Sequence, residues 1–368
     1  MTDYSITLPS YSIGTNVFDK IEEICRPFGT RAVAVGGHKG LESIKEQLLS
    51  AVADTAIEII DFVWYGGEAS EENVQKLAKT ESVQNADMVF AIGGGKALDT
   101  CKAYCALVNK PVFTFPTIAS TCAATTAVSI MYNSDGTFKA PDFHKAPPQH
   151  AFIYTPVIVQ APKQYIWAGM GDTYAKYFEA EMSARDEDLV HYHALGVTAS
   201  KMCLDPLLTY GKAAMEDIER GITSYAAEQT ILAIIVTTGI ASILLTAEHI
   251  VDYNSGLAHA VFYSLTAWEH IEKRHLHGEV VALGVLILLL VDGNQKMFET
   301  MYAFNKSVAL PTCLADIEMQ SADVPKLVRM AAAMKDIEHN PYKITEEMLQ
   351  KAFEQLDYYN QNHHFSKE

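Results

Sequence analysis

The sequence is short of cysteines and of basic residues, and each shortage excludes a class of protein. Its six cysteines form no Cys-x-x-Cys pair, which argues against a disulfide scaffold and against a cysteine zinc site. Lys and Arg together number 28 against 45 Asp and Glu, and the net charge is −17. Nucleic acids and anionic membranes bind basic patches, so we expect neither as a partner.

Long uninterrupted apolar runs are missing as well. The longest, residues 231–245 and 280–291, are broken by Thr or Gly and are shorter than a membrane-spanning helix. We expect both to be buried core helices. The start of the chain, Met1-Thr2-Asp3-Tyr4, lacks the basic residues and the apolar run of a signal peptide. We therefore expect a cytoplasmic protein with reduced thiols.

What is present is a globular composition on a chain too long for one core. The chain has 368 residues, of which 49% are hydrophobic and 20% are charged, and this length predicts two domains. Strand-like apolar runs at 31–35, 56–65, 88–92 and 111–115 alternate with helical patterns. The alternation predicts an α/β domain with a doubly wound, mostly parallel sheet.

The pattern changes after Pro162. Residues 151–159 resemble a last strand, and only helical patterns follow them. We therefore predict an α/β domain at 1–160 and an all-α domain at 161–368.

A glycine turn joins a buried strand to a helix near residue 93. The run 88–92 ends at Gly93-Gly94-Gly95, Lys96 adds a positive charge, and apolar residues then recur at helical spacing. Glycines let a backbone approach a diphosphate closely, and the N–H groups and dipole of the next helix favour its charge. The alternative is a plain strand–helix junction, because short glycine motifs often match by chance.

Ligands of parallel sheets bind at the carboxyl ends of the strands, and Gly36-Gly37, Gly93–Gly95 and Pro116-Thr117 all follow predicted strands. An acid at the tip of the first strand would bond a ribose 2′-hydroxyl and repel a 2′-phosphate. This chain has His38-Lys39 there instead. Lys39 therefore favours NADP(H) over NAD(H), or it simply begins a surface helix.

Small and hydroxylated residues fill the stretch 117–126, where hydroxyls and amides can contact a phosphate and a ribose. Residues 133–136, Asn-Ser-Asp-Gly, then predict a hairpin. The cofactor-binding residues that we predict in this half are Gly37, Lys39, Gly93, Gly94, Gly95, Lys96, Asp99, Thr117, Ser120, Thr126, Val128 and Tyr132.

Three separate helices of the second half carry one carboxylate and two imidazoles. Asp172 follows Gly169 and Gly171, a pattern that predicts a helix start capped by Asp172. His259 lies in an apolar helix, and His277 precedes another. Such a set can hold a divalent cation and leave positions open for water or substrate. Spacing alone leaves a helix cap and a core histidine as alternatives.

Taken in order, these blocks resemble the iron-containing alcohol dehydrogenase and glycerol dehydrogenase superfamily. The resemblance rests on Gly93–Lys96 with Asp99, on 116–121, on Gly169–Asp172, and on Ala258-His259 followed by 276–279. It implies an N-terminal dinucleotide-binding domain and a helical metal- and substrate-binding domain, the dehydroquinate synthase-like architecture. It also implies Asp172, His259 and His277 as metal ligands, a small-molecule substrate and a homo-oligomer.

Departures from the family pattern indicate which subfamily the sequence resembles. Iron-type members carry a further His four residues after the ligand Asp, where this chain has Lys176; three ligands resemble the branch that uses Zn²⁺ rather than Fe²⁺. Glycerol dehydrogenases have an Asp where this chain has Cys122, and Phe262 and Tyr263 stand where the family has a second His. The loop 121–124, Thr-Cys-Ala-Ala, together with Gly171-Asp172-Thr173 and Lys176 resembles the 2-hydroxycarboxylate dehydrogenases, which reduce 2-oxo acids with NADPH.

We therefore predict a metal-dependent, NAD(P)-linked oxidoreductase that transfers a hydride between a nicotinamide and a small carbonyl compound, with 2-oxo acids favoured. In this hypothesis Cys122 lines the substrate site, and His275 exchanges a proton or contacts an anion. Lys176 faces an anionic substrate, or it only pairs with Asp172 or Glu179. The alternatives are a glycerol dehydrogenase, a dehydroquinate synthase-like lyase and a non-catalytic binding protein.

Overall fold

The computed structural model describes residues 3–363. Met1 and Thr2, part of the start from which we expect no signal peptide, lie outside this range. The chain forms two compact units: the first contains the residues up to Lys163 with Glu216–Ile243, and the second contains Gln164–Met215 with the residues from Leu244 onward. The domain boundary near residue 160 stays a prediction.

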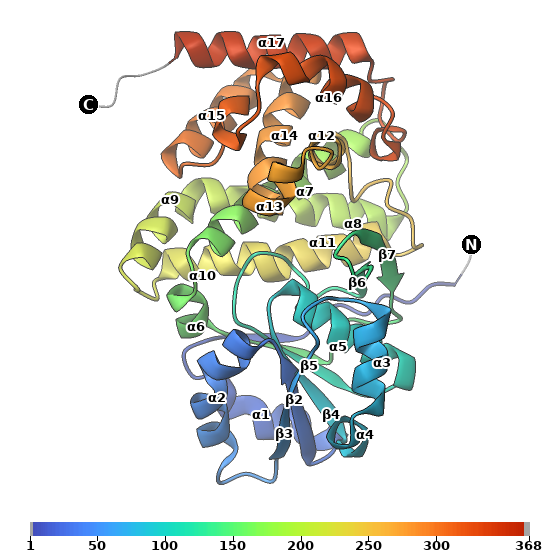
Figure 1. Ribbon diagram of the computed structural model, residues 1–368, viewed down its shortest axis with the longest axis vertical. Coiled ribbons are helices and arrows are strands. Elements are labelled where there is room, and N and C mark those ends of the chain that lie inside the picture. The colour runs from blue at the N-terminus through green and yellow to red at the C-terminus, as the bar shows by residue number, and fades with distance from the viewer. Residues whose placement is uncertain (1–2, 364–368) are drawn as a thin grey trace. The chain divides into compact units, whose positions relative to one another are not determined.

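Within the described residues, six parallel strands form the sheet of the first unit, in the order β1–β8–β5–β4–β2–β3 (Figure 1). Their bounds are β1 (Tyr11–Gly14), β2 (Arg31–Gly36), β3 (Glu58–Trp64), β4 (Met88–Gly93), β5 (Val112–Pro116) and β8 (His150–Tyr154). Every residue of β4 and β5 is buried, because helices cover both faces of a parallel sheet. The predicted α/β fold class is confirmed.

The winding of the sheet reverses next to β2, which pairs with β3 on one side and β4 on the other. Ligands of such sheets bind at the carboxyl ends of the strands where the order reverses. Helices α1 and α2 lie on one side of the sheet and α3, α4 and α5 on the other (Figure 1). The bounds of these helices are α1 (Ile21–Cys25), α2 (His38–Val52), α3 (Glu71–Lys79), α4 (Glu81–Asn85) and α5 (Gly95–Val108).

The predicted hairpin is present as β6 (Val128–Tyr132) and β7 (Phe138–Phe143), an antiparallel pair outside the main sheet. Gly136 has φ +88° in its turn, a conformation that glycine adopts without strain. The expected strand at 151–159 is partly wrong: β8 ends at Tyr154, and α6 (Thr155–Gln160) follows it. Pro156 lies in the first turn of α6, where a helix tolerates proline. The β-branched residues that follow it are typical of strands, which explains the wrong prediction.

Glu216–Ile243 joins the first unit although it lies in the second half of the chain. It contains α10 (Tyr225–Leu232), a π-helical turn (Ala233–Thr237) and most of α11 (Thr238–Leu245). The Thr125 hydroxyl donates a hydrogen bond of 2.5 Å to the Ile235 carbonyl oxygen, which ties this turn to the loop after β5. π-turns leave a carbonyl group without its usual helical partner, and Thr125 supplies one.

Among its described residues the second unit contains helices joined by turns and loops, and no strand. Its longer helices are α7 (Gln164–Ser183), α8 (His191–Ser200), α9 (Asp205–Glu219, shared with the first unit), α12 (Leu257–Leu265), α13 (Glu269–Arg274), α14 (His277–Val291), α15 (Gln295–Ser307), α16 (Val324–Ala331) and α17 (Glu346–Asn362). Short 3₁₀ turns complete both units at Val17–Lys20, Arg26–Phe28, Lys201–Cys203, Leu314–Ile317, Ser321–Asp323 and Lys335–Ile337. α14 is buried along most of its length and contacts α7, α12, α15 and α17.

Among the described residues, one helical stretch, Tyr225–Leu245, is long and apolar enough to cross a membrane by length and composition. Its apolar window is 72% buried inside the protein, which agrees with the predicted core helix.

A buried histidine fastens the edge strand β1 to β8. His150 is 5% exposed, and its two ring nitrogens lie 2.7 and 3.0 Å from the hydroxyl oxygens of Ser10 and Ser12. Burial, with a smaller contribution from Lys20, lowers the pKa of His150 to about 4. Folded protein therefore keeps His150 neutral at pH values at which the unfolded chain protonates it.

This difference predicts an acid sensitivity. Between about pH 6.5 and pH 4 the unfolded state binds one more proton than the folded state, so stability falls as the pH falls. His150→Gln keeps polar atoms for the two serines but cannot titrate. We expect wild type to lose about 2 kcal/mol more unfolding free energy than His150→Gln between pH 7.5 and pH 5. Urea unfolding at both pH values measures this, and equal losses would contradict it.

Candidate metal centre and nucleotide turn

The glycine turn joins β4 to α5 as predicted. Gly93 has φ +140°, a backbone conformation that side-chain-bearing residues rarely adopt, and Gly94 precedes the helix with extended backbone and no side-chain cap. The first N–H groups of a helix have no partner inside the helix. The turn therefore presents the uncapped positive end of a 14-residue helix at the carboxyl edge of the sheet, a suitable place for a phosphate.

Lys39 and Lys96 differ in what surrounds them. Lys39 is exposed in the first turn of α2, two residues after Gly37. The Lys96 ammonium lies 2.6 Å from a carboxylate oxygen of Glu68 and 5.0 Å from the centre of the Tyr132 ring. Glu68 and Tyr132 therefore hold the Lys96 charge in place.

Asp99, Thr126 and Val128 all contact one buried lysine that was not among the predicted site residues. Lys102 is 2% exposed, and its ammonium lies 2.8 Å from Asp99 Oδ1, 3.0 Å from Thr126 Oγ1 and 2.5 Å from the Val128 carbonyl oxygen. Burial raises the pKa of Asp99, and the Lys102 charge acts against that rise. The sequence signal was the spacing: Lys102 follows Asp99 by three residues on one helix face.

The loop after β5 returns to the glycine turn. Thr117 is buried, and its N–H donates to the Gly93 carbonyl oxygen at 3.1 Å. Ser120 and Cys122 are half-buried farther along the loop. Thr117, Gly93 and Gly94 thus lie together, whereas the contacts of Asp99 and Thr126 are those of a buried polar network.

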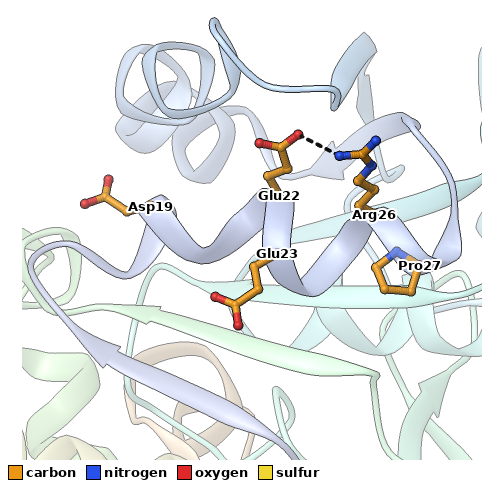
Figure 2. A pocket seen from close by; sticks show the side chains of 5 residues that line it. All are labelled: Asp19, Glu22, Glu23, Arg26 and Pro27. Carbon is orange, nitrogen blue, oxygen red and sulfur yellow. Dashed lines mark ion pairs between the residues drawn. The ribbon is translucent and has the colours of Figure 1, made fainter.

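The surface of the first unit also has a shallow pocket beside α1, lined by Asp19, Glu22, Glu23, Arg26 and Pro27 (Figure 2). An ion pair of 3.8 Å joins Glu22 and Arg26 there. The pocket includes none of the predicted site residues.

The structure brings Asp172, His259 and His277 together in the second unit. They come from α7, α12 and α14, and their ligand atoms lie within 4.8 Å of one another. The nearer pairs are Asp172 Oδ1 with His277 Nε2 at 3.2 Å and with His259 Nε2 at 3.4 Å. Asp172 lies inside α7, so the expectation that it caps a helix start is wrong.

Two glycines of α14 allow this convergence. A Cβ atom on Gly278 would lie 2.0 Å from the Ala168 carbonyl oxygen of α7, and one on Gly284 would lie 2.4 Å from the Ala258 carbonyl oxygen of α12. Only glycine permits such close contact between helix backbones. Gly278 follows the ligand candidate His277, and Ala258 precedes His259, so the close contacts adjoin the donor atoms.

Glu179 orients His259. Its Oε2 lies 2.7 Å from His259 Nδ1, which leaves Nε2 directed at Asp172. Its Oε1 accepts hydrogen bonds from the backbone N–H groups of Gly256 at 3.0 Å and His259 at 2.9 Å. A carboxylate on the second ring nitrogen is the usual partner of a metal-binding histidine. Glu179 is seven residues, two helical turns, after Asp172, and this spacing was the overlooked signal.

The charges around the donors favour a cation. Burial raises the pKa of Asp172, but hydrogen bonds with His259 and His277 outweigh it and hold that pKa well below its usual range. Burial lowers the pKa of His259, but the carboxylates of Glu179 and Asp172 outweigh it and raise that pKa to about 10. Two carboxylates around one imidazole attract positive charge, either a proton or a metal dication.

The donor set fits a divalent metal. Ligands of tetrahedral Zn²⁺ lie about 2.1 Å from the ion, which places neighbouring ligand atoms about 3.4 Å apart. The separations of 3.2 and 3.4 Å around Asp172 agree with this spacing. The rings of Phe262 and His277 form a T-shaped pair, with ring centres 4.3 Å apart at 77°, an arrangement that restrains the His277 ring.

Lys176 and His275 have partners that the sequence did not suggest. The Lys176 ammonium donates to the backbone carbonyl oxygen of Asn254 and, at 2.8 Å, to its side-chain oxygen. Among the described residues Lys176 forms no ion pair, so the pairing with Asp172 or Glu179 is not observed. His275 Nδ1 lies 2.8 Å from Glu279, and its Nε2 is buried without a hydrogen-bond partner among those residues.

A parallel sheet with an uncapped glycine turn and a helical unit with an Asp-His-His cluster are the parts that an enzyme with a nucleotide cofactor and a divalent metal requires. A model of the iron-containing alcohol dehydrogenase family matches residues 9–154. Glycerol dehydrogenase of Thermotoga maritima is 32% identical over 367 residues, which cover 95% of each chain. Hydroxycarboxylate dehydrogenase A of Escherichia coli is 30% identical over 333 residues, which cover 89% of this chain and 90% of that protein.

A solved structure agrees with these relatives. The crystal structure of a probable glycerol dehydrogenase from Sinorhizobium meliloti has a TM-score of 0.81 and 25% identity, covering 98% of this chain and all of that one. The chain belongs to the iron-containing alcohol dehydrogenase family. It is a dehydrogenase that acts on alcohol CH–OH groups.

The Glu179 geometry predicts the effect of removing its charge. Glu179→Gln has one acceptor oxygen instead of two, so it cannot accept from both His259 Nδ1 and the two backbone N–H groups, and it loses the negative charge. We therefore expect Zn²⁺ to bind about 10- to 100-fold more weakly. Titration of the metal-free protein against a chelating indicator measures this affinity. Glu181→Gln, on the same helix with a partly exposed side chain, is the matched control. Equal affinities in both variants would disprove the orienting role.

Proposed function

We propose that this protein catalyses the reversible, NADP(H)-linked reduction of small 2-oxo acids to 2-hydroxy acids, with Zn²⁺ as the resident metal. The observation that carries the proposal is the Asp172–His259–His277 cluster with Glu179 behind it. When bound, the metal polarises a carbonyl oxygen and the nicotinamide supplies the hydride. Three protein donors leave positions open for a substrate oxygen.

The chain's own residues hold these groups. Asp172, His259 and His277 would bind the metal, and Glu179 keeps the His259 ring in its orientation. Gly93, Gly94 and the start of α5 would receive the diphosphate, and the exposed Lys39 would meet a 2′-phosphate. We assign the proton exchange of the alcohol to His275, whose Nδ1 lies 2.8 Å from Glu279 and whose Nε2 is buried with no hydrogen-bond partner among the described residues.

The proposal that the substrate is a 2-oxo acid depends on the residue at position 122. Cys122 stands where glycerol dehydrogenases have an acid, and an uncharged residue there removes a repulsive charge from an anionic substrate. The Escherichia coli hydroxycarboxylate dehydrogenase, at 30% identity, supports this class. A glycerol dehydrogenase is the second candidate, favoured by the match to the Thermotoga maritima protein along 95% of the chain.

The cellular setting belongs to the same proposal. None of the six cysteines, all within the described part, forms a disulfide, which suits a reducing cytoplasm. We propose a homo-oligomer there, with a small-molecule substrate.

Cofactor oxidation at 340 nm tests the activity. We expect turnover of 2-oxobutanoate or 2-oxoglutarate with NADPH, at rates that rise when Zn²⁺ is added to metal-depleted protein. Glyceraldehyde and dihydroxyacetone, each with NADPH and NADH, are the comparison substrates. Turnover of dihydroxyacetone with NADH alone would assign the protein to the glycerol branch.

Cys122→Asp tests the substrate assignment directly. The new carboxylate should repel a 2-oxo acid and bind a polyol hydroxyl, so we expect kcat/KM to fall about tenfold for 2-oxobutanoate and to rise for dihydroxyacetone. Cys122→Ser, which adds no charge, is the control and should change both values less. A uniform loss on both substrates would contradict a role in substrate choice.

A further inference from the structure

The backbone segment before His259 is fastened to α7 by two side chains. Lys176, one turn after Asp172, donates to both oxygens of Asn254. Glu179 accepts from the N–H groups of Gly256 and His259. Helix α7 therefore carries one candidate metal ligand, Asp172, and also holds in place the segment that precedes a second one, His259.

The Lys176 ammonium is satisfied by its hydrogen bonds to Asn254. Lys176 is 7% exposed, and a buried ammonium is costly unless oxygen atoms surround it. Asn254 supplies a main-chain and a side-chain oxygen to the one charge. An ammonium held in this way is poorly placed to meet an incoming carboxylate, because binding one would break bonds that already satisfy it.

We propose that Lys176 is a positioning residue of the metal centre: through Asn254 it sets the path of residues 254–259 and so the distance between His259 and Asp172. This inference rests on the proposed metal site and replaces the expected contact of Lys176 with substrate. Lys176 does not act on the reacting atoms.

The direction in which Zn²⁺ affinity changes when the Lys176 charge is removed separates a positioning role from an electrostatic one. A positive charge one helical turn from Asp172 repels a dication, so removing that charge without moving His259 would strengthen Zn²⁺ binding. Removing a residue that positions His259 would weaken it. Lys176→Met keeps an unbranched apolar side chain as far as Cε, with sulfur in place of Cδ, and removes the ammonium.

The experiment is a Zn²⁺ titration of the full-length, metal-depleted protein. We expect Lys176→Met to bind about tenfold more weakly than wild type and Asn254→Ala to bind more weakly by a smaller factor. The double variant should bind no more weakly than Lys176→Met, because both changes break one contact. Lys212→Met, an exposed lysine of α9, should match wild type.

Two further readouts address folding and geometry. Lys176→Arg keeps the charge and donors and should recover part of the affinity. The visible spectrum of Co²⁺-loaded protein reports ligand geometry and should change in Lys176→Met but not in Lys212→Met. If Lys176→Met does not fold, Asn254→Ala carries the same test.

Tighter or unchanged Zn²⁺ binding in Lys176→Met would overturn the positioning role. So would a raised KM for 2-oxobutanoate with unchanged Zn²⁺ affinity, since that result identifies a substrate contact. If wild type itself binds no Zn²⁺, the metal site of the proposed function fails, and this inference fails with it. The two failures are therefore distinguishable by the wild-type titration alone.

Discussion

The candidate metal centre depends on direct backbone contact between helices. α14 touches α7 at Gly278 and α12 at Gly284, at distances that leave no room for a Cβ atom. The donors lie beside these contacts, so the positions of Asp172, His259 and His277 follow from helix packing and not from flexible loops. Burial of α14 then makes this packing part of the core of the second unit. The site inherits the rigidity of that core.

Much of the first unit could be predicted from the sequence, because its signals are local. The strands β2, β4 and β5 are short apolar runs that end at glycine or proline, and such runs have few alternatives in an α/β pattern. Residues 155–159 show where the local signal fails. Branched residues favour strands, but Pro156 in the first turn allows a helix there.

The second unit was less predictable because its decisive contacts join distant segments. Gly169 and Gly171 suggested a helix start, whereas they lie inside α7. The donors could be named as a set, but nothing in their spacing shows that three helices meet. Lys176 illustrates the same limit: its partner Asn254 lies far along the chain, and only the folded structure brings the two together.

The three donors also have a consequence for folding. They belong to segments far apart in the sequence, so an ion bound by all three would act as a crosslink that the unfolded chain lacks. Binding only to the folded state adds stability in proportion to the logarithm of the metal concentration above its dissociation constant. The Asp-His-His cluster would then make the integrity of the second unit depend on the supply of metal in its surroundings, apart from any catalytic step.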